Sequence, residues 1–176
     1  MNKLPTGVYW GRFNPPHRGH LSVIKRFKER YRLTVAIGSA ERRNERTNPF
    51  TGSERKAMME AYLGEAGIEG VRVVILEDGD SETWAVDNLI RKCKPDVVFL
   101  STERRGPLDA ALAKAGVRVA RFQRTGTVSS TLIRHLIATG DPAWRKLTGR
   151  VVVKLIEEYG GIERIRRIYA RSSTLT

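Results

Sequence analysis

Cysteine and long apolar runs are nearly absent from this sequence. Cys93 is the single cysteine among 176 residues, which excludes an intramolecular disulfide and a metal site built from several thiolates. No apolar stretch approaches the roughly 20 residues that a membrane-spanning helix needs. The residues after Met1 lead into a strand pattern rather than the apolar core of a signal peptide. We therefore expect a cytoplasmic protein with no membrane partner.

Acidic residues are also scarce in comparison with basic ones. The chain has 19 Asp and Glu residues against 32 Lys and Arg, which gives a net charge of +13. A polyanionic partner is therefore expected. Because the arginines are spread along the whole chain instead of forming a stripe or a basic tail, a small polyphosphate is favoured over nucleic acid.

Short apolar segments alternate with helical patterns through the first two thirds of the chain. Each segment is too short and too uniformly apolar for a half-exposed strand, and so predicts a buried parallel strand. The alternation predicts an α/β fold with a Rossmann-like, doubly wound parallel sheet of five strands, which binds ligands at the carboxyl ends of its strands. The expected strands cover residues 7–10, 33–37, 71–76, 97–100 and 117–120.

From about residue 128 the pattern is helical throughout. Ser129 or Ser130 can cap the first of these helices, and Asp141-Pro142 is a typical cap followed by a first helical position. No repeat, low-complexity tract or long linker divides the chain. We expect one domain over residues 1–170, with a helical C-terminal part and a polar tail over 171–176.

Two histidines stand three residues apart at the predicted start of a helix, in the segment Gly11-Arg12-Phe13-Asn14-Pro15-Pro16-His17-Arg18-Gly19-His20. Positions i and i+3 share one helix face, and the first turn offers unpaired N–H groups and the positive end of the helix dipole. Such a start attracts phosphate, and the two arginines add fixed charge. The two glycines leave room for a nucleotide. The alternative is a loop with two incidental histidines.

Two further segments carry groups suited to phosphate. Hydroxyls at a predicted helix start in Ser129-Ser130-Thr131-Leu132-Ile133-Arg134 can bind phosphate oxygens, and the arginine can make a bidentate contact; alone, the segment is more typical of a simple cap. The other is Gly38-Ser39-Ala40, followed by Asn48-Pro49-Phe50-Thr51-Gly52-Ser53-Glu54-Arg55. Arg55 there opposes the helix dipole, which a ligand phosphate could offset; the alternative is a solvated arginine.

Together these three segments resemble the nucleotidylyltransferases with the HxGH signature, most closely the archaeal-type nicotinamide-mononucleotide adenylyltransferases. Their order and spacing match over nearly the whole chain. The resemblance implies that the 5′-phosphate of a mononucleotide attacks the α-phosphorus of ATP in line and releases pyrophosphate. It also implies that Mg²⁺ is bound mainly through the ATP phosphates and water, with no metal site made of protein residues, and that the chain forms a homo-oligomer.

The resemblance assigns roles residue by residue. His17, His20, Arg134 and Arg12 are implied to be catalytic, with His20 stabilising the charge that develops on the α-phosphate. The residues implied to bind ATP are Gly11, Arg12, Phe13, His17, Gly19, His20, Ser129, Ser130, Thr131 and Arg134. Those implied to bind the acceptor, nicotinamide mononucleotide, are Ser39, Asn48, Phe50, Arg55, Asp80 and Trp84; a core position is the alternative for Trp84.

The sequence departs from the family pattern on the acceptor side. Ser101-Thr102-Glu103-Arg104-Arg105-Gly106-Pro107 stands where the family tends to have a shorter turn with Asn-Pro, and Asn14 replaces a commoner glutamine. Arg104 and Arg105 could receive a different or additional phosphate. Phosphopantetheine or flavin mononucleotide as acceptor, and a nucleotide-binding or RNA-binding module without catalysis, are therefore the alternatives.

Overall fold

A parallel β-sheet forms the centre of the molecule. The computed structural model describes residues 4–103, 106–124 and 126–173. The strands are β1 (Thr6–Gly11), β2 (Arg32–Ile37), β3 (Arg72–Ile75), β4 (Val97–Ser101) and β5 (Arg118–Phe122), and their spatial order is β3-β2-β1-β4-β5. All neighbouring pairs are parallel, which confirms the predicted doubly wound sheet. The strand order reverses between β1 and β4, so the topological switch point lies there.

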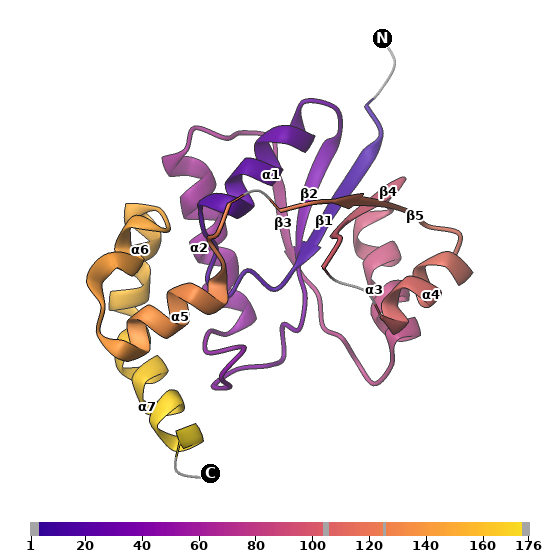
Figure 1. Cartoon of the computed structure of the whole chain (residues 1–176). Helices are drawn as coiled ribbons and strands as arrows, with labels where there is room; N and C mark the ends of the chain where they lie inside the picture. The colour runs from indigo at the N-terminus through magenta and orange to yellow at the C-terminus, as the bar shows by residue number, and fades with distance from the viewer. Residues whose placement is uncertain (1–3, 104–105, 125, 174–176) are drawn as a thin grey trace.

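Helices cover both faces of this sheet (Figure 1). On one face lie α1 (Arg18–Lys28) and α2 (Gly52–Glu65), and on the other lie α3 (Glu82–Cys93) and α4 (Pro107–Lys114). The two faces have separate apolar cores, because successive side chains of a strand point in opposite directions. In β1, Tyr9 belongs to the core on the α1 side, whereas Val8 and Trp10 belong to the core on the α3 side.

The C-terminal part forms an outer group of helices next to α2 (Figure 1). It contains α5 (Ser130–Thr139), the 3₁₀ helix η1 (Pro142–Lys146), α6 (Arg150–Glu158) and α7 (Gly161–Ser173). As predicted, Ser129 caps α5, and the Asp141 side chain accepts the N–H of Ala143 at the start of η1. Helix α7 continues three residues into the expected tail over 171–176, whose residues 174–176 lie outside the described chain.

The outer helices share one apolar core with the sheet. Ile133 of α5, Val152 of α6 and Ile165 of α7 are fully buried in the cluster that also holds Ile24 of α1 and Val35 of β2. This packing fixes the start of α5 near the loop that follows β1. None of the helices in the described residues is long and apolar enough to cross a membrane.

Candidate active site

A cavity of about 540 Å³ opens at the carboxyl edge of the sheet. Its wall comes from the ends of β1, β2, β4 and β5 and from the start of α5, segments that lie far apart in the sequence. This is the place at which an open α/β sheet binds its ligands. The lining residues are Tyr9, Trp10, Gly11, Arg12, Phe13, Asn14, His17, His20, Ser39, Thr47, Ser101, Glu103, Phe122, Arg124, Ser129, Ser130, Thr131 and Arg134.

His17 and His20 stack against each other on this wall, with their ring centroids 3.6 Å apart. His17 is the N-cap of α1, and its Nδ1 accepts the N–H of Gly19 at 3.1 Å. His20 Nδ1 accepts the N–H of His17 at 3.1 Å, so the two residues form a capping box. Because Nδ1 is an acceptor in both, each neutral imidazole is assigned its proton on Nε2, which is left to donate to a ligand.

Both imidazoles are neutral near pH 7. Burial lowers the pKa of His17 to about 3, and the nearby charges of Arg124 and Arg18 act in the same direction. Burial also lowers the pKa of His20 well below its usual value, with further contributions from His17 and Arg124. The pair therefore offers hydrogen-bond donors without the desolvation cost of two buried charges.

Side-chain donors from distant elements hold the histidine loop in place. Arg134 Nη1 donates to the carbonyl of Asn14 at 2.8 Å, and Ser130 Oγ donates to that of Pro15 at 2.8 Å. Thr148 Oγ1 donates to the carbonyl of Pro16 at 2.8 Å. Proline has no N–H, so the two prolines can join this network only as acceptors. The loop path is thus fixed by the C-terminal helical part as well as by β1.

The start of α5 faces the cavity with hydroxyls and a buried guanidinium. Ser129 Oγ accepts the N–H of Leu132 at 3.1 Å, so Ser129 forms the helix cap that was the alternative interpretation of this segment. Arg134 is 5% exposed and also donates to Thr131 Oγ1 at 3.1 Å. Its Nε has no hydrogen-bond partner among the described residues. Burial lowers the pKa of Arg134, yet guanidinium stays charged in proteins.

On the β2 side, Ser39 is the predicted acceptor residue that lines the cavity. It has a φ of 50°, in the left-handed region that a serine adopts only when its surroundings fix it. Asp78 supplies that restraint, because its carboxylate accepts the Ser39 N–H at 2.9 Å and the hydroxyl at 2.6 Å. Gly38 precedes it because a Cβ there would lie 2.7 Å from Trp10 Nε1.

Asn48 and Phe50 are predicted to contact the acceptor, but in this structure they lie behind the cavity wall. They are 1% and 0% exposed, and neither lines the cavity. The Asn14 amide donates to the Phe50 carbonyl and accepts its N–H, both at 3.3 Å, and also donates to Asn48 Oδ1 at 3.4 Å. Buried polar groups need hydrogen-bond partners, and these bonds satisfy the buried Asn14 amide. Asn48 and Phe50 therefore support the histidine loop from the side away from the cavity.

Arg55 is predicted to contact a phosphate, but in this structure its side chain does not line the cavity. Its side chain is 0% exposed and donates to the carbonyls of four residues: Arg12, Gly38, Ser39 and Thr51. The sequence could not distinguish this position from a surface one, because the carbonyls come from three separate segments.

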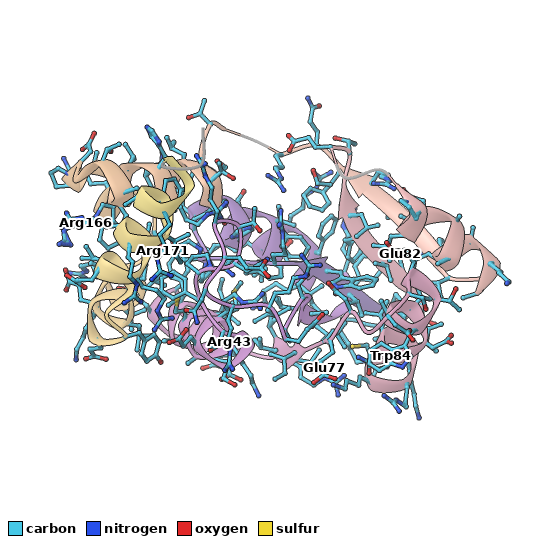
Figure 2. The ribbon with its side chains drawn as sticks, turned by 90° about the horizontal axis from the view of Figure 1, so that it is seen from below. Arg43, Glu77, Glu82, Trp84, Arg166 and Arg171 are labelled. Carbon is cyan, nitrogen blue, oxygen red and sulfur yellow. The ribbon has the colours of Figure 1, made fainter. Side chains whose placement is uncertain are left out.

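Asp80 and Trp84 stand outside the cavity wall. Asp80 is exposed, and Trp84 is 38% exposed with its indole against Gly79, where an added Cβ would lie 2.3 Å from the ring. Figure 2 places Trp84 on the α3 side of the molecule, away from Arg166 and Arg171 of α7. The core position considered for Trp84 is therefore wrong. Arg104 and Arg105 lie outside the described residues.

Several lining residues are not among the binding residues that the sequence predicts. Tyr9 and Trp10 lie near the end of β1, Ser101 ends β4 and Phe122 ends β5. Their position at strand ends was the available signal. Outside the strands, the group also contains Asn14, Thr47, Glu103 and Arg124.

The cavity's charge is mostly positive. Glu103 is the one acidic residue among its described lining residues, and it pairs with Arg124 at 3.4 Å. Arg12 and Arg134 carry further positive charge. Gly19 is absent from the wall of the large cavity and lies with both histidines around a smaller one. No cluster of three His, Cys, Asp or Glu side chains suited to a metal occurs in the described ranges.

Comparison with known proteins places this arrangement in a family. The cytidylyltransferase-like family matches residues 8–136, which include the cavity segments from β1 through Arg134. The nicotinamide-nucleotide adenylyltransferase of Pyrobaculum arsenaticum is 35% identical over 170 residues, covering 91% of this chain and 92% of the relative. That of Saccharolobus solfataricus is 37% identical over 173 residues, covering 94% and 97%.

A solved structure agrees in fold. The bifunctional NMN adenylyltransferase/ADP ribose pyrophosphatase of Francisella tularensis, complexed with AMP and a Mn ion, has a TM-score of 0.63 at 19% identity. The match covers 97% of this chain and 56% of that one. The family match over residues 8–136 and the two near-full-length relatives establish that the chain is a cytidylyltransferase-like protein and belongs with the nicotinamide-nucleotide adenylyltransferases.

Proposed function

We propose that this protein transfers the adenylyl group of ATP to nicotinamide mononucleotide, which yields NAD and pyrophosphate. The observation that carries the proposal is the meeting of His17 and His20 with Ser129, Thr131 and Arg134 on one cavity wall. The names of the relatives that match nearly the whole chain supply the acceptor.

The reaction is a single in-line displacement. An oxygen of the acceptor 5′-phosphate forms a bond to the α-phosphorus of ATP, and the bond from that phosphorus to the bridging oxygen breaks with its electron pair. The protein's contribution is then chiefly alignment and stabilisation of charge. The Nε2–H of His20 donates to the α-phosphate, where negative charge increases, and His17 supports the neighbouring oxygens.

The β- and γ-phosphates lie at the start of α5. Free N–H groups and the positive helix end favour an anion there, and the hydroxyls of Ser129, Ser130 and Thr131 add donors. Arg134 and Arg12 hold phosphate oxygens on either side. A divalent ion enters with ATP as part of the substrate, and we propose Mg²⁺, which keeps water and phosphate oxygens as its ligands.

The acceptor occupies the β2 side of the cavity. Ser39, held by Asp78, is the polar residue placed to meet it. We propose Trp84 as an outer contact for the pyridine ring, because its partly exposed indole lies against the residue that follows Asp78. The adenosine part of ATP then lies on the opposite side, by Ser101 of β4 and Phe122 of β5, so the turn after β4 that was expected on the acceptor side adjoins ATP instead. We further propose that the sheet and the C-terminal helices are one domain, because they share one core.

A product assay with several acceptors tests the function. Purified protein is incubated with ATP, Mg²⁺ and one acceptor at a time: nicotinamide mononucleotide, flavin mononucleotide or 4′-phosphopantetheine. We expect a dinucleotide with nicotinamide mononucleotide at a kcat/KM far above the others. A higher kcat/KM with another acceptor would show that this other acceptor is the substrate. If no pyrophosphate is released with any acceptor, the proposed enzymatic function is wrong.

A further inference from the structure

The buried guanidinium of Arg55 joins two loops that line the cavity from different strands. Nη1 donates to the carbonyl of Arg12, after β1, and to that of Gly38, after β2, both at 2.8 Å. Nη2 donates to the carbonyl of Ser39 at 2.8 Å. The remaining bond runs from Nε to Thr51, the N-cap of its own helix, at 3.2 Å. Four of the five guanidinium N–H groups are therefore accounted for.

These two loops meet different substrates under the proposed function. The loop after β1 carries Arg12 and leads to the histidines, so it belongs to ATP. The loop after β2 carries Ser39, so it belongs to the acceptor. Adenylyl transfer requires the acceptor phosphate and the α-phosphorus to approach along one line. The rate of the reaction therefore depends on the relative position of the two loops.

The surroundings of Arg55 restrain the β2 loop on both sides. The carbonyl of Ser39 bonds to Arg55, while its N–H and hydroxyl bond to Asp78. Helix α2 lies close against this loop, since a Cβ on Gly52 would come within 2.9 Å of Ala40. The side chain of Arg55 is thus held between its own helix and the two loops, with no room to swing into the cavity.

An arginine is needed here because its planar fork reaches several acceptors at once. A lysine ammonium would carry the same charge from a single nitrogen on a flexible stem. Burial lowers the pKa of Arg55 to about 10, while Asp78 and Glu41 favour its charged form and Arg12 opposes it. The guanidinium is consequently charged near neutral pH, which strengthens its bonds to the carbonyls.

We propose that Arg55 is a positioning residue for adenylyl transfer, which fixes the distance between the ATP loop after β1 and the acceptor loop after β2. This proposal rests on the proposed function. Arg55 touches neither substrate; it acts through the backbone of Arg12 and of residues 38–39. Its removal leaves each substrate its binding groups but misaligns the two reacting phosphates.

The test compares two arginines whose side chains each donate four hydrogen bonds. In Arg55→Met, the bonds between the loops are lost. Arg164→Met is the matched control, because Arg164 is also largely buried and donates to Pro49, to both Glu54 oxygens and to Tyr159. It supports the same first turn of α2, but none of its partners lines the cavity. Steady-state kinetics with both substrates are normalised to folded protein measured by circular dichroism.

We expect kcat of Arg55→Met to fall about 100-fold, because a misplacement of roughly 1 Å can reduce a rate by that factor. The KM for each substrate should stay within about threefold, since the binding groups remain. Arg164→Met should lower the melting temperature and keep kcat per folded molecule. Equal loss of kcat in the two variants, or an unchanged kcat in Arg55→Met, would overturn the proposal. If Arg55→Met does not fold, Arg55→Lys takes its place with the same criteria.

Chemical rescue adds a readout that a purely structural role would not move. In Arg55→Ala, free guanidinium at concentrations below those that unfold the protein should raise kcat at least about tenfold, because the ion can rejoin the loop carbonyls. Absence of rescue in folded Arg55→Ala would count against positioning by these bonds. The wild type in the same assay separates the two proposals, since only failure of the function itself leaves it unable to make NAD.

Discussion

The two sides of the cavity differ in how many of their predicted binding residues line it. On the side formed by the β1 loop and α5, the histidines, the hydroxyls and Arg134 all reach the wall. On the β2–β3 side, Ser39 reaches it, whereas Asn48, Phe50 and Arg55 lie behind it and Trp84 lies outside. His17 and Ser129 cap the helices whose starts face the cavity, and so their helices place them. Arg55 also lies in a first helical turn, but its side chain is placed by contacts with other segments that only the folded chain reveals.

The largest expected effect concerns the histidine side. Replacement of His20 by alanine should lower kcat by about 10²–10³, the usual loss when one donor to developing negative charge is removed. Steady-state kinetics with nicotinamide mononucleotide and MgATP measure it. The exposed third histidine supplies the control, since His135→Ala should keep wild-type turnover. Near-wild-type turnover in folded His20→Ala would refute the role of that side chain.

A smaller loss is expected when the charge of Arg134 is kept but its fork is lost. In Arg134→Lys, one ammonium cannot hold Asn14, Thr131 and a phosphate together, so kcat/KM for ATP should fall about tenfold to a hundredfold. Arg145→Lys is the matched control, because Arg145 pairs with Glu157 at the surface. Equal values for the two variants would contradict the placement of ATP at the start of α5.

The histidine side should also make folding sensitive to acid. The folded protein keeps His17 neutral down to about pH 3, whereas the unfolded chain binds a proton near pH 6.5. The unfolded state therefore binds more protons below pH 6.5, and stability declines as the pH falls from 6.5 towards 3. The decline approaches about 1.4 kcal/mol per pH unit for each such histidine.

Urea unfolding between pH 7 and pH 5 measures this slope. In His17→Asn, the amide oxygen can replace Nδ1 as the cap acceptor but does not titrate. We expect a shallower dependence in this variant than in the wild type. Identical slopes would show that the burial of His17 contributes nothing to acid sensitivity.

The smallest effect is expected on the acceptor side. Loss of an aromatic contact in Trp84→Ala should raise the KM for nicotinamide mononucleotide about threefold to tenfold, since such contacts contribute about 0.5–1.5 kcal/mol. The KM for ATP serves as the internal control and should not change. A KM for the acceptor equal to that of the wild type would leave Trp84 without a role and confine the acceptor to the cavity around Ser39.

Much of the fold could be predicted because its signals are local. Uniformly apolar segments predict the five strands to within one or two residues, and Ser129 marks a helix start in the structure as expected. The doubly wound order follows from alternation of strand and helix. The bond between Ser130 and the carbonyl of Pro15, 115 positions apart, has no such local signal.

The acceptor side resisted prediction for the same reason. The sequence around Arg55 is the same whether its guanidinium faces a phosphate or four carbonyls. Its burial depends on how the chain folds three separate segments around it. Trp84 has its helical position in both interpretations, and its exposure depends on the path of the loop through Gly79. Only the tertiary structure shows whether each of these two side chains is buried or exposed.

The decisive test of adenylyl transfer is the amount of NAD and of pyrophosphate that the wild-type protein makes from nicotinamide mononucleotide and MgATP. We expect equal amounts of the two products, both dependent on the acceptor, because one displacement at the α-phosphorus makes them together. Absence of NAD, or pyrophosphate released at the same rate without nicotinamide mononucleotide, would contradict it.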